Sequence, residues 1–267
     1  MSDQGFQSYF LRAQFCLALP PLLSVTHGDI FQILFSDGTL SAINVFTGER
    51  GILPRVSENI YIEVNRRDVG YVQPVLMVGS LSSHVHDLLI ARRHDLFSTP
   101  VPHTTRPRRM NEKHGTEYWF VKTSTMESML KSKLFVECGK LGDFLYGTTE
   151  ASIRNVAQRE KKHCLLDASF DIPHLLARSL FPIVIFVGAQ SWRQIQDIIS
   201  FDGGSEYQAK ELIMKDRETE KNMEKYLSGV VKERTLEESY KRVLEIVERL
   251  GKDTWIPQTV DPHGRLI

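Results

Sequence analysis

The sequence of 267 residues has little cysteine and no long apolar run. Its cysteines, Cys16, Cys138 and Cys164, are odd in number and far apart, and no two of them form a CxxC pair. This spacing argues against a disulfide framework or a zinc site, so we expect small core residues in a reducing compartment. No apolar stretch approaches the about 20 residues that span a bilayer, and the N-terminus MSDQGFQSYF lacks the features of a signal peptide. We therefore expect a cytoplasmic protein that does not insert into the membrane.

The sequence also lacks a net charge. Its 33 basic and 33 acidic residues give a formal net charge of zero, so whole-protein electrostatics give no support to nucleic-acid binding. A binding site for an anion must therefore be local. The hydrophobic fraction of 42% is enough to build real cores, and the length favours two globular domains.

Residues 1–64 contain several short β-like segments. Stretches such as DIFQILFS and NIYIEV alternate apolar and polar residues and follow one another at a spacing of roughly ten residues, which is typical of a small β-barrel or sandwich. We predict an all-β domain at 1–64, followed by a short polar linker at 65–72.

Residues 73–251 have a different pattern, in which strands and helices alternate. The almost wholly apolar run at 181–187 is typical of a strand that is covered on both faces of a parallel sheet. We predict an α/β domain at 73–251 and assign 252–267 to a final strand and a tail.

Two helix starts in this α/β part have capping-box spacing. Ser124 stands three residues before Glu127, and Thr235 stands three residues before Glu238. In such a box each side chain satisfies a backbone N–H of the first turn that has no partner within the helix. The spacing predicts a helix beginning at each of these places.

Residues 101–121 carry more chemistry than any other stretch. Arg106, Arg108 and Arg109 stand there with Glu112 and an aromatic run that begins at Tyr118. A planar guanidinium donates two parallel hydrogen bonds to an oxyanion, and a phosphate is the obvious ligand. The stretch therefore predicts a phosphate site, although a solvated basic loop is the commoner fate of an arginine-rich turn.

An ordered set of motifs accompanies this stretch: VLMVGSLSSHV, VPHTTRPRR, EYWFV, LFVECG, YGTT, HCLLDAS and a terminal WIP. Together with the preceding β-rich part, the set resembles the SH3-guanylate-kinase-like tandem of membrane-associated guanylate kinase homologues, in their discs-large-type branch. The resemblance covers nearly the whole chain. It implies an SH3-like barrel, then an α/β P-loop-type guanylate-kinase-like domain with a parallel sheet. Its last strand, near Trp255, would return to the SH3 sheet and hold the two domains together within the chain.

The resemblance fails at the phosphate loop. True guanylate kinases have a loop of the type GPSGxGKS, whose backbone amides and lysine cradle the triphosphate of ATP. The corresponding segment here begins at Gly79, with His84 at the place of a glycine and Val85 at the place of the lysine. Phosphoryl transfer depends on positioning and charge neutralisation. We predict a degenerate P-loop, no catalytic residues, no cofactor or metal, and no useful kinase activity.

The acceptor side keeps more of the family pattern. By resemblance, Arg106, Arg109, Tyr118 and Tyr146 match the residues that hold the monophosphate of GMP, and Glu112 matches an acid that braces the arginines. Arginine forks and tyrosine hydroxyls together supply directional donors for a phosphate. We expect Arg108, between the two arginines, to face solvent.

Three further residues match the base-reading positions of the enzymes: Glu137, Thr148 and Asp167. Asp167 stands at a strand end, where it could instead cap the following turn, and YGTT is also typical of a helix start, which leaves Thr148 open. The chain departs from the enzymes at Pro102, where they often place a serine hydroxyl.

A phosphate pocket that is kept without an ATP site suggests that the phosphate stays on its carrier. In this family the carrier is phosphoserine or phosphothreonine in a partner peptide. The resemblance implies a non-catalytic scaffold or adaptor module that acts in cell polarity, peripheral at the plasma membrane or at cell junctions. Two alternatives stay open, a weak GMP-binding guanylate kinase and a structural interaction module with a vestigial pocket, which Pro102 favours.

Overall fold

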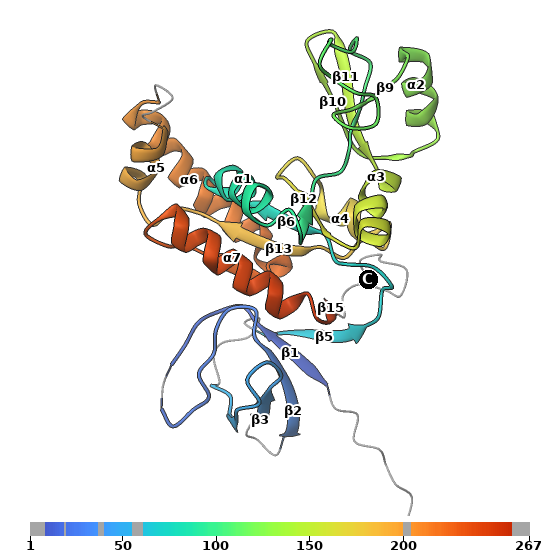
Figure 1. The fold of residues 1–267 in the computed structure, drawn as a ribbon. Coiled ribbons are helices and arrows are strands. Elements are labelled where there is room, and N and C mark those ends of the chain that lie inside the picture. Colours follow the sequence, from blue (N-terminus) through green and yellow to red (C-terminus); the bar gives the residue numbers. More distant parts are fainter. Residues whose placement is uncertain (1–8, 19, 37–39, 55–60, 200–203, 258–267) are drawn as a thin grey trace, which may run out of the picture.

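The computed structural model describes residues 9–257 apart from 19, 37–39, 55–60 and 200–203 (Figure 1). Three sheets organise the described residues. The N-terminal segment at 1–8, which bears on the expected absence of a signal peptide, and the expected tail at 258–267 lie outside this range.

The first sheet is antiparallel, and its strands have the order β15-β5-β1-β2-β3-β4. Its strands are β1 (Phe10–Ala13), β2 (Ile30–Ser36), β3 (Leu40–Asn44), β4 (Arg50–Ile52), β5 (Tyr61–Arg67) and β15 (Thr254–Pro257). Phe31 and Ile33, alternate residues of β2, are buried together with Ala42 and Leu53, because successive side chains of a strand point to opposite faces. The expectation of a small all-β fold at the start of the chain is confirmed.

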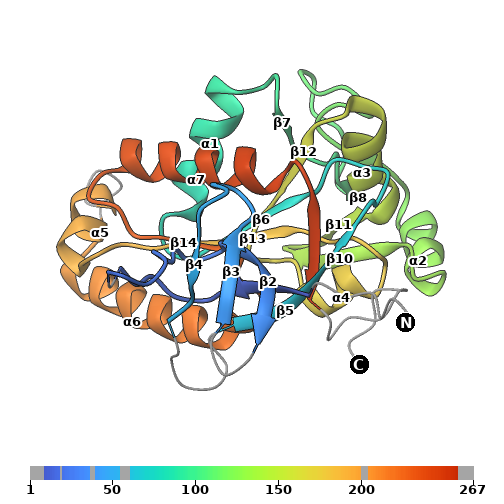
Figure 2. The same ribbon diagram turned by 90° about the horizontal axis from the view of Figure 1, so that it is seen from below.

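The sheet is completed by β15, which comes from the other end of the chain. This strand pairs antiparallel with β5 (Figure 2), and the ring of Trp255 lies 4.9 Å from that of Phe10 over the buried Val64. The expected return of the last strand is therefore confirmed. Because β5 runs on to Arg67, it includes the first residues of the expected linker at 65–72; the domain boundaries themselves stay a prediction.

The second sheet is parallel and has the strand order β14-β13-β6-β12-β7. Its strands are β6 (Val75–Val78), β7 (Phe97–Ser98), β12 (His163–Leu166), β13 (Ile183–Val187) and β14 (Gly229–Val231). The helices of this part are α1 (Ser82–Arg92), α3 (Glu150–Arg154) with the π-helical turn η1 (Asn155–Glu160), α4 (Ile172–Leu176), α5 (Trp192–Ile199), α6 (Glu206–Met223) with the 3-10 turn η3 (Glu224–Tyr226), and α7 (Leu236–Leu250). Every residue of β13 is buried, as the apolar run at 181–187 predicted.

Each face of the parallel sheet has its own core. Val75 and Met77 of β6 pack with α1 and α7, whereas Leu76 and Val78 pack with α3 and α4. Full burial of one such side chain stabilises a fold by about 1.5–3 kcal/mol. The alternation of β6 between two apolar layers therefore fixes the strand in the middle of the domain.

The two predicted helix starts have different outcomes. Thr235 and Glu238 exchange side-chain to backbone hydrogen bonds of 3.1 Å at the start of α7, as predicted. The helix predicted from Ser124 and Glu127 is present as α2, but the predicted cap is wrong, because the helix begins after Lys122, which offers no side-chain cap. Ser124 therefore lies inside the first turn.

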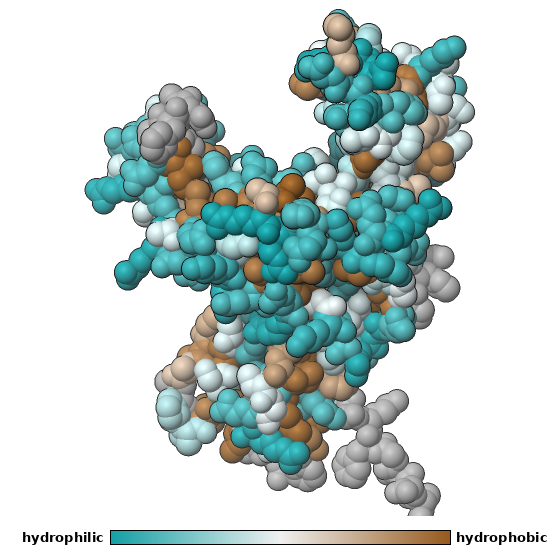
Figure 3. Space-filling view, in the orientation of Figure 1, coloured by the Kyte–Doolittle hydropathy of each residue, from teal (hydrophilic) through white to brown (hydrophobic). Residues whose placement is uncertain are grey.

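The third sheet forms a lobe that projects from the parallel sheet (Figure 1). It consists of β8 (His103–Thr104), β9 (Trp119–Phe120), β10 (Phe135–Leu141) and β11 (Phe144–Thr149), with the helix α2 (Thr123–Lys131) beside them. The helices α5 and α6 project on the other side of the molecule, and the surface is hollowed between them and the lobe (Figure 3).

The first and second sheets are joined by close polar contacts. Arg249 of α7 donates to Asp29, just before β2, at 2.8 Å. Gly28 has a φ of +85°, and a Cβ at this position would lie 2.0 Å from the backbone oxygen of Ser228, so only glycine allows the turn to rest there. The expected contact between the two domains within the chain is present.

The cysteines differ from the sequence-based expectation. Cys164 is buried, but Cys16 and Cys138 are exposed, so the expectation of three core residues is wrong for two of them. Cys138 is exposed because β10 extends beyond the core, and its residues after Glu137 face solvent. Among the described residues, no helix is long and apolar enough to cross a membrane, and no cluster of His, Cys, Asp or Glu could hold a metal ion.

Candidate functional site

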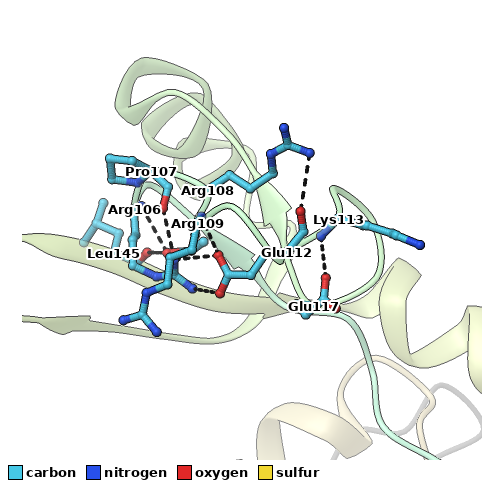
Figure 4. A network of polar contacts seen from close by, with 9 residues as sticks. Arg106, Pro107, Arg108, Arg109, Glu112, Lys113, Glu117 and Leu145 are labelled. Carbon is cyan, nitrogen blue, oxygen red and sulfur yellow. Dashed lines mark hydrogen bonds and ion pairs between the residues drawn. The ribbon is translucent and has the colours of Figure 1, made fainter.

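The arginine-rich stretch folds around one carboxylate (Figure 4). Glu112 accepts two hydrogen bonds from the guanidinium of Arg106, at 2.8 and 2.7 Å, and a third from the backbone N–H of Arg109 at 2.8 Å. The Arg106 fork also donates to the carbonyl oxygen of Pro107 at 3.0 Å. Glu112 therefore fixes Arg106 and ties it to the backbone of Arg109, as its expected bracing role requires.

The ion pair keeps both partners charged. Glu112 raises the pKa of Arg106 above its ordinary range, with a smaller contribution from Tyr146. The Arg106 side chain and then the Arg109 backbone N–H lower the pKa of Glu112 to about 2. At neutral pH the cluster of Arg106, Arg109 and Glu112 therefore has one net positive charge.

The guanidinium of Arg106 lies over two aromatic rings. Its guanidinium carbon lies 5.2 Å from the centre of the Tyr118 ring and 5.5 Å from that of Phe120, distances typical of cation–π contacts. Tyr118 in turn meets Tyr146 edge to face, with ring centres 5.9 Å apart. The structure thus brings the four expected phosphate-binding residues into one group with Glu112.

Arg109 differs from its neighbours in that its guanidinium is free. The side chain is exposed, and Figure 4 shows no contact to its guanidinium among the residues drawn. No hydrogen bond or ion pair joins it to the part of the chain that the structure describes. Arg108 is exposed as expected, and its only hydrogen bond within that part is a 3.4 Å contact with the backbone oxygen of Glu112.

The second group of predicted residues lies on the same sheet. Tyr146 and Thr148 are two apart on β11 and so face the same side, and Glu137 of β10 stands directly opposite Thr148. Burial, followed by the negative charge of Asp167, raises the pKa of Glu137. The charge of Asp167, which directly follows β12 of the parallel sheet, therefore contributes to the surroundings of Glu137.

Asp167 also caps the following turn, which was the alternative role considered for it. Its carboxylate accepts from the backbone N–H of Ser169 at 2.9 Å and from the Ser169 hydroxyl at 2.5 Å, and so caps the turn after β12. Thr149, beside Thr148, caps α3 by accepting from the backbone N–H of Ser152 at 3.2 Å. The helix start in YGTT therefore belongs to Thr149, which leaves Thr148 on the pocket face.

Two threonines position the arginine loop, and sequence reasoning missed them. The hydroxyl of Thr104 donates to the backbone oxygen of Leu145 and accepts from the backbone N–H of Arg106. The hydroxyl of Thr105 accepts from the backbone N–H of Leu145 at 2.9 Å. The adjacent threonines before Arg106 were the available signal, because paired hydroxyls next to a turn commonly bind backbone groups.

Other parts of the acceptor pocket are less complete. Pro102 offers no hydroxyl, and its carbonyl oxygen is used by the backbone N–H of Trp119 at 2.8 Å. Any phosphate here would rely on Arg106, Arg109 and the two tyrosines.

The loop after β6 is the counterpart of the acceptor pocket. Gly79 has a φ of +108°, and a Cβ there would lie 2.5 Å from the backbone oxygen of Val187. Helix α1 begins at Ser82, so the connection is short. Val85 is fully buried and packs in the core between the parallel sheet, α1 and α7, while His84 is half-buried. Val85, which matches the lysine position of the enzymes, thus belongs to the core and supplies no cation.

Three comparisons with known proteins find relatives of this chain. Residues 71–250 match the family model described as "Guanylate kinase". The chain is 36% identical over 205 residues to "Disks large 1 tumor suppressor protein" of Drosophila melanogaster, which covers 75% of this chain and 21% of that protein. It is also 36% identical over 201 residues to "Disks large homolog 3" of Homo sapiens, covering 74% of this chain and 24% of that protein.

The chain spans about a fifth to a quarter of the length of the curated relatives that it matches. Among solved structures, the SH3-kinase fragment of tight junction protein 3 in apo form covers 94% of this chain at 17% identity, with a TM-score of 0.46.

Proposed function

The chain belongs to the guanylate kinase family, alongside the Disks large homologues, and we propose that it is a non-catalytic scaffold module that binds a phosphorylated partner peptide. The phosphate of a phosphoserine or phosphothreonine would lie between Arg106 and Arg109, with the hydroxyls of Tyr118 and Tyr146 beside it. The module would act in the cytoplasm, peripheral at the plasma membrane or at cell junctions, as its resemblance to discs-large-type proteins implies.

The observation that carries this proposal is the difference between the two arginines. Glu112 and the Pro107 carbonyl use three of the five N–H donors of Arg106, which holds the fork in one orientation. Arg109 keeps its whole guanidinium for an incoming ligand. An oriented arginine beside a free one suits a dianion, which can accept charge-assisted hydrogen bonds from both.

The carrier of the phosphate is inferred from the loop after β6. No lysine stands in the segment 79–85, and Val85 is buried in the core. A donor nucleotide would lack the cation that neutralises its phosphates during transfer. The exposed side chains of Arg108 and Arg109 leave the acceptor pocket open at the surface, so a phosphate could remain attached to a peptide.

Calorimetry with a matched pair of peptides tests the proposal. We expect the phosphorylated peptide to bind more tightly than its unphosphorylated form, and Arg106→Ala to abolish this preference. Arg108→Ala is the matched control, because it removes an arginine of the same loop that lies outside the pocket. Equal affinity of the wild-type protein for both peptides would overturn the proposal.

A second candidate is GMP binding, favoured by the pairing of Glu137 with Thr148 at the positions that read the base in the enzymes. In that case GMP would displace the phosphopeptide, and a Glu137→Gln variant would lose GMP without losing the peptide. A coupled assay for ADP should detect no turnover with GMP and ATP, whichever ligand binds.

A further inference from the structure

A buried carboxylate from a distant helix lies on the loop after β6. Asp216 of α6 is 6% exposed. Its two oxygens accept from the backbone N–H of Ser80 at 2.7 Å and from the Ser80 hydroxyl at 2.5 Å. A longer contact of 3.4 Å comes from the backbone N–H of Ala189, after β13. One side chain thus joins α6 to the ends of two adjacent strands.

The loop has no N–H donor left between Gly79 and the first residue of α1. The N–H of Ser80 donates to Asp216, that of Leu81 to the backbone oxygen of Val187 at 3.1 Å, and that of Ser82 to the backbone oxygen of Gly79 at 3.2 Å. A phosphate that binds where a strand turns into a helix needs such N–H groups to be free. In this chain they are occupied from within.

The surroundings of Asp216 are shaped for a carboxylate. A Cβ on Gly188 would lie 3.0 Å from a carboxylate oxygen of Asp216 and 2.5 Å from the ring of Phe186. A glycine at this position therefore leaves room for the Asp216 carboxylate. Burial raises the pKa of Asp216, whereas the bonds from Ser80 and the positive charge of Lys232 act in the opposite direction. A buried carboxylate with several donors and a nearby cation is a stable arrangement.

We propose that Asp216 is a built-in anionic ligand of the loop 79–82, which takes the N–H and the hydroxyl of Ser80 that a nucleotide phosphate would otherwise meet and fastens α6 over the loop. The donor site is then closed by occupancy as well as by the missing lysine. This inference does not depend on phosphopeptide binding, because Asp216 belongs to a different part of the molecule from the Arg106 pocket.

Hydrogen exchange with and without ATP tests the proposal on the intact chain. In Asp216→Ala we expect exchange of the Ser80 amide and of the α6 amides to become at least about tenfold faster, since their shared anchor is lost. Millimolar ATP should slow the Ser80 amide again in this variant and leave the wild-type protein unchanged. Asp216→Asn, which keeps the shape but not the charge, should show the same effects to a smaller extent.

Glu218→Ala is the matched control, because it removes an exposed carboxylate from the same helix. The proposal fails if ATP slows the Ser80 amide equally in the wild-type protein, if it protects neither protein, or if α6 exchanges no faster without Asp216. Phosphopeptide affinity should be unchanged in Asp216→Ala. Failure of the wild-type protein to bind the phosphopeptide would therefore count against the proposed function alone.

Discussion

The acceptor pocket and the loop after β6 each hold a carboxylate on backbone and side-chain donors, yet only one of them keeps free donors. In the pocket, Glu112 binds Arg106 and the backbone of Arg109, and the Arg109 guanidinium stays available. In the loop, Asp216 binds both donors of Ser80, and the segment 79–85 contains no lysine. A carboxylate beside an exposed guanidinium organises a binding site, whereas a buried carboxylate that takes the donors of the loop fills it.

The acceptor pocket is also more accessible to solvent than the loop after β6. The side chains of Arg106 and Glu112 are 12% and 15% exposed and lie beside the exposed side chain of Arg109, while Asp216 is buried. A ligand can reach the first site without moving a helix. This difference in access supports the proposed binding on the acceptor side, and changes in the loop, in the arginine pair and in pH can test it.

The largest expected effect comes from restoring the lysine of the loop. Val85→Lys would place an ammonium group in a fully buried position of the core, where an unpaired charge costs about 3–5 kcal/mol. We expect the free energy of unfolding, measured by denaturant titration, to fall by this amount, and no ADP to form with GMP and ATP.

Ser83→Lys is the control for that experiment, because Ser83 is exposed on the same helix. A surface change of this kind should alter stability by no more than about 0.5 kcal/mol. If Val85→Lys folded with wild-type stability and produced ADP, the loop would be a repairable donor site. The contrast between an open acceptor pocket and a filled loop would then be wrong.

Much of this fold could be predicted from the sequence because its signals are local. The apolar run at 181–187 marked the central strand β13, and Thr235 with Glu238 marked the start of α7. The same kind of signal gave the wrong cap at Ser124, because α2 begins after Lys122, which has an extended backbone and no side-chain cap. The outer half of β10 gave no signal, since its residues after Glu137 face solvent on a lobe that extends past the core.

The residues of the candidate sites also differ in whether the sequence could predict them. Arg106, Arg109 and Glu112 lie within one short stretch, where the arginines indicated a phosphate site and the family resemblance gave each residue its expected role. Asp216 could not be found in this way, because its partner Ser80 is 136 positions away in the sequence and the contact depends on how α6 is placed. The anchoring hydroxyl of Thr104 was missed for a related reason, since its acceptor on Leu145 belongs to another strand.

The second prediction tests whether orientation matters in the pocket. Arg106→Lys keeps the positive charge, but an ammonium group cannot bind Glu112 through two parallel bonds and still present a planar fork to phosphate. We expect the affinity for the phosphopeptide to fall by about tenfold, a loss of about 1.4 kcal/mol, with little change for the unphosphorylated peptide.

Arg108→Lys serves as the control in the same titration, because Arg108 is exposed and its only hydrogen bond to the described residues is a long contact with the backbone oxygen of Glu112. If Arg106→Lys bound the phosphopeptide as tightly as Arg108→Lys does, the loop would attract anions through its total charge, which both variants keep. The distinction between an organised pocket and a filled loop would then lose its basis.

The smallest expected effect is a pH dependence that arises in the ligand and leaves the protein unchanged. The pKa of Glu112 is depressed to about 2, so the stabilisation from its ion pair is present above the ordinary glutamate pKa and is lost only as the pH falls through about 2. The second pKa of a phosphorylated serine is about 6, so its dianionic fraction falls about fourfold between pH 7 and pH 5.5. Phosphopeptide affinity measured by calorimetry should fall by a similar factor. A peptide with aspartate in place of the phosphoserine should bind equally at both values, because its carboxylate stays ionised in this range. A parallel fall for the aspartate peptide would place the titrating group in the pocket itself and contradict the view of Glu112 as a permanently charged brace.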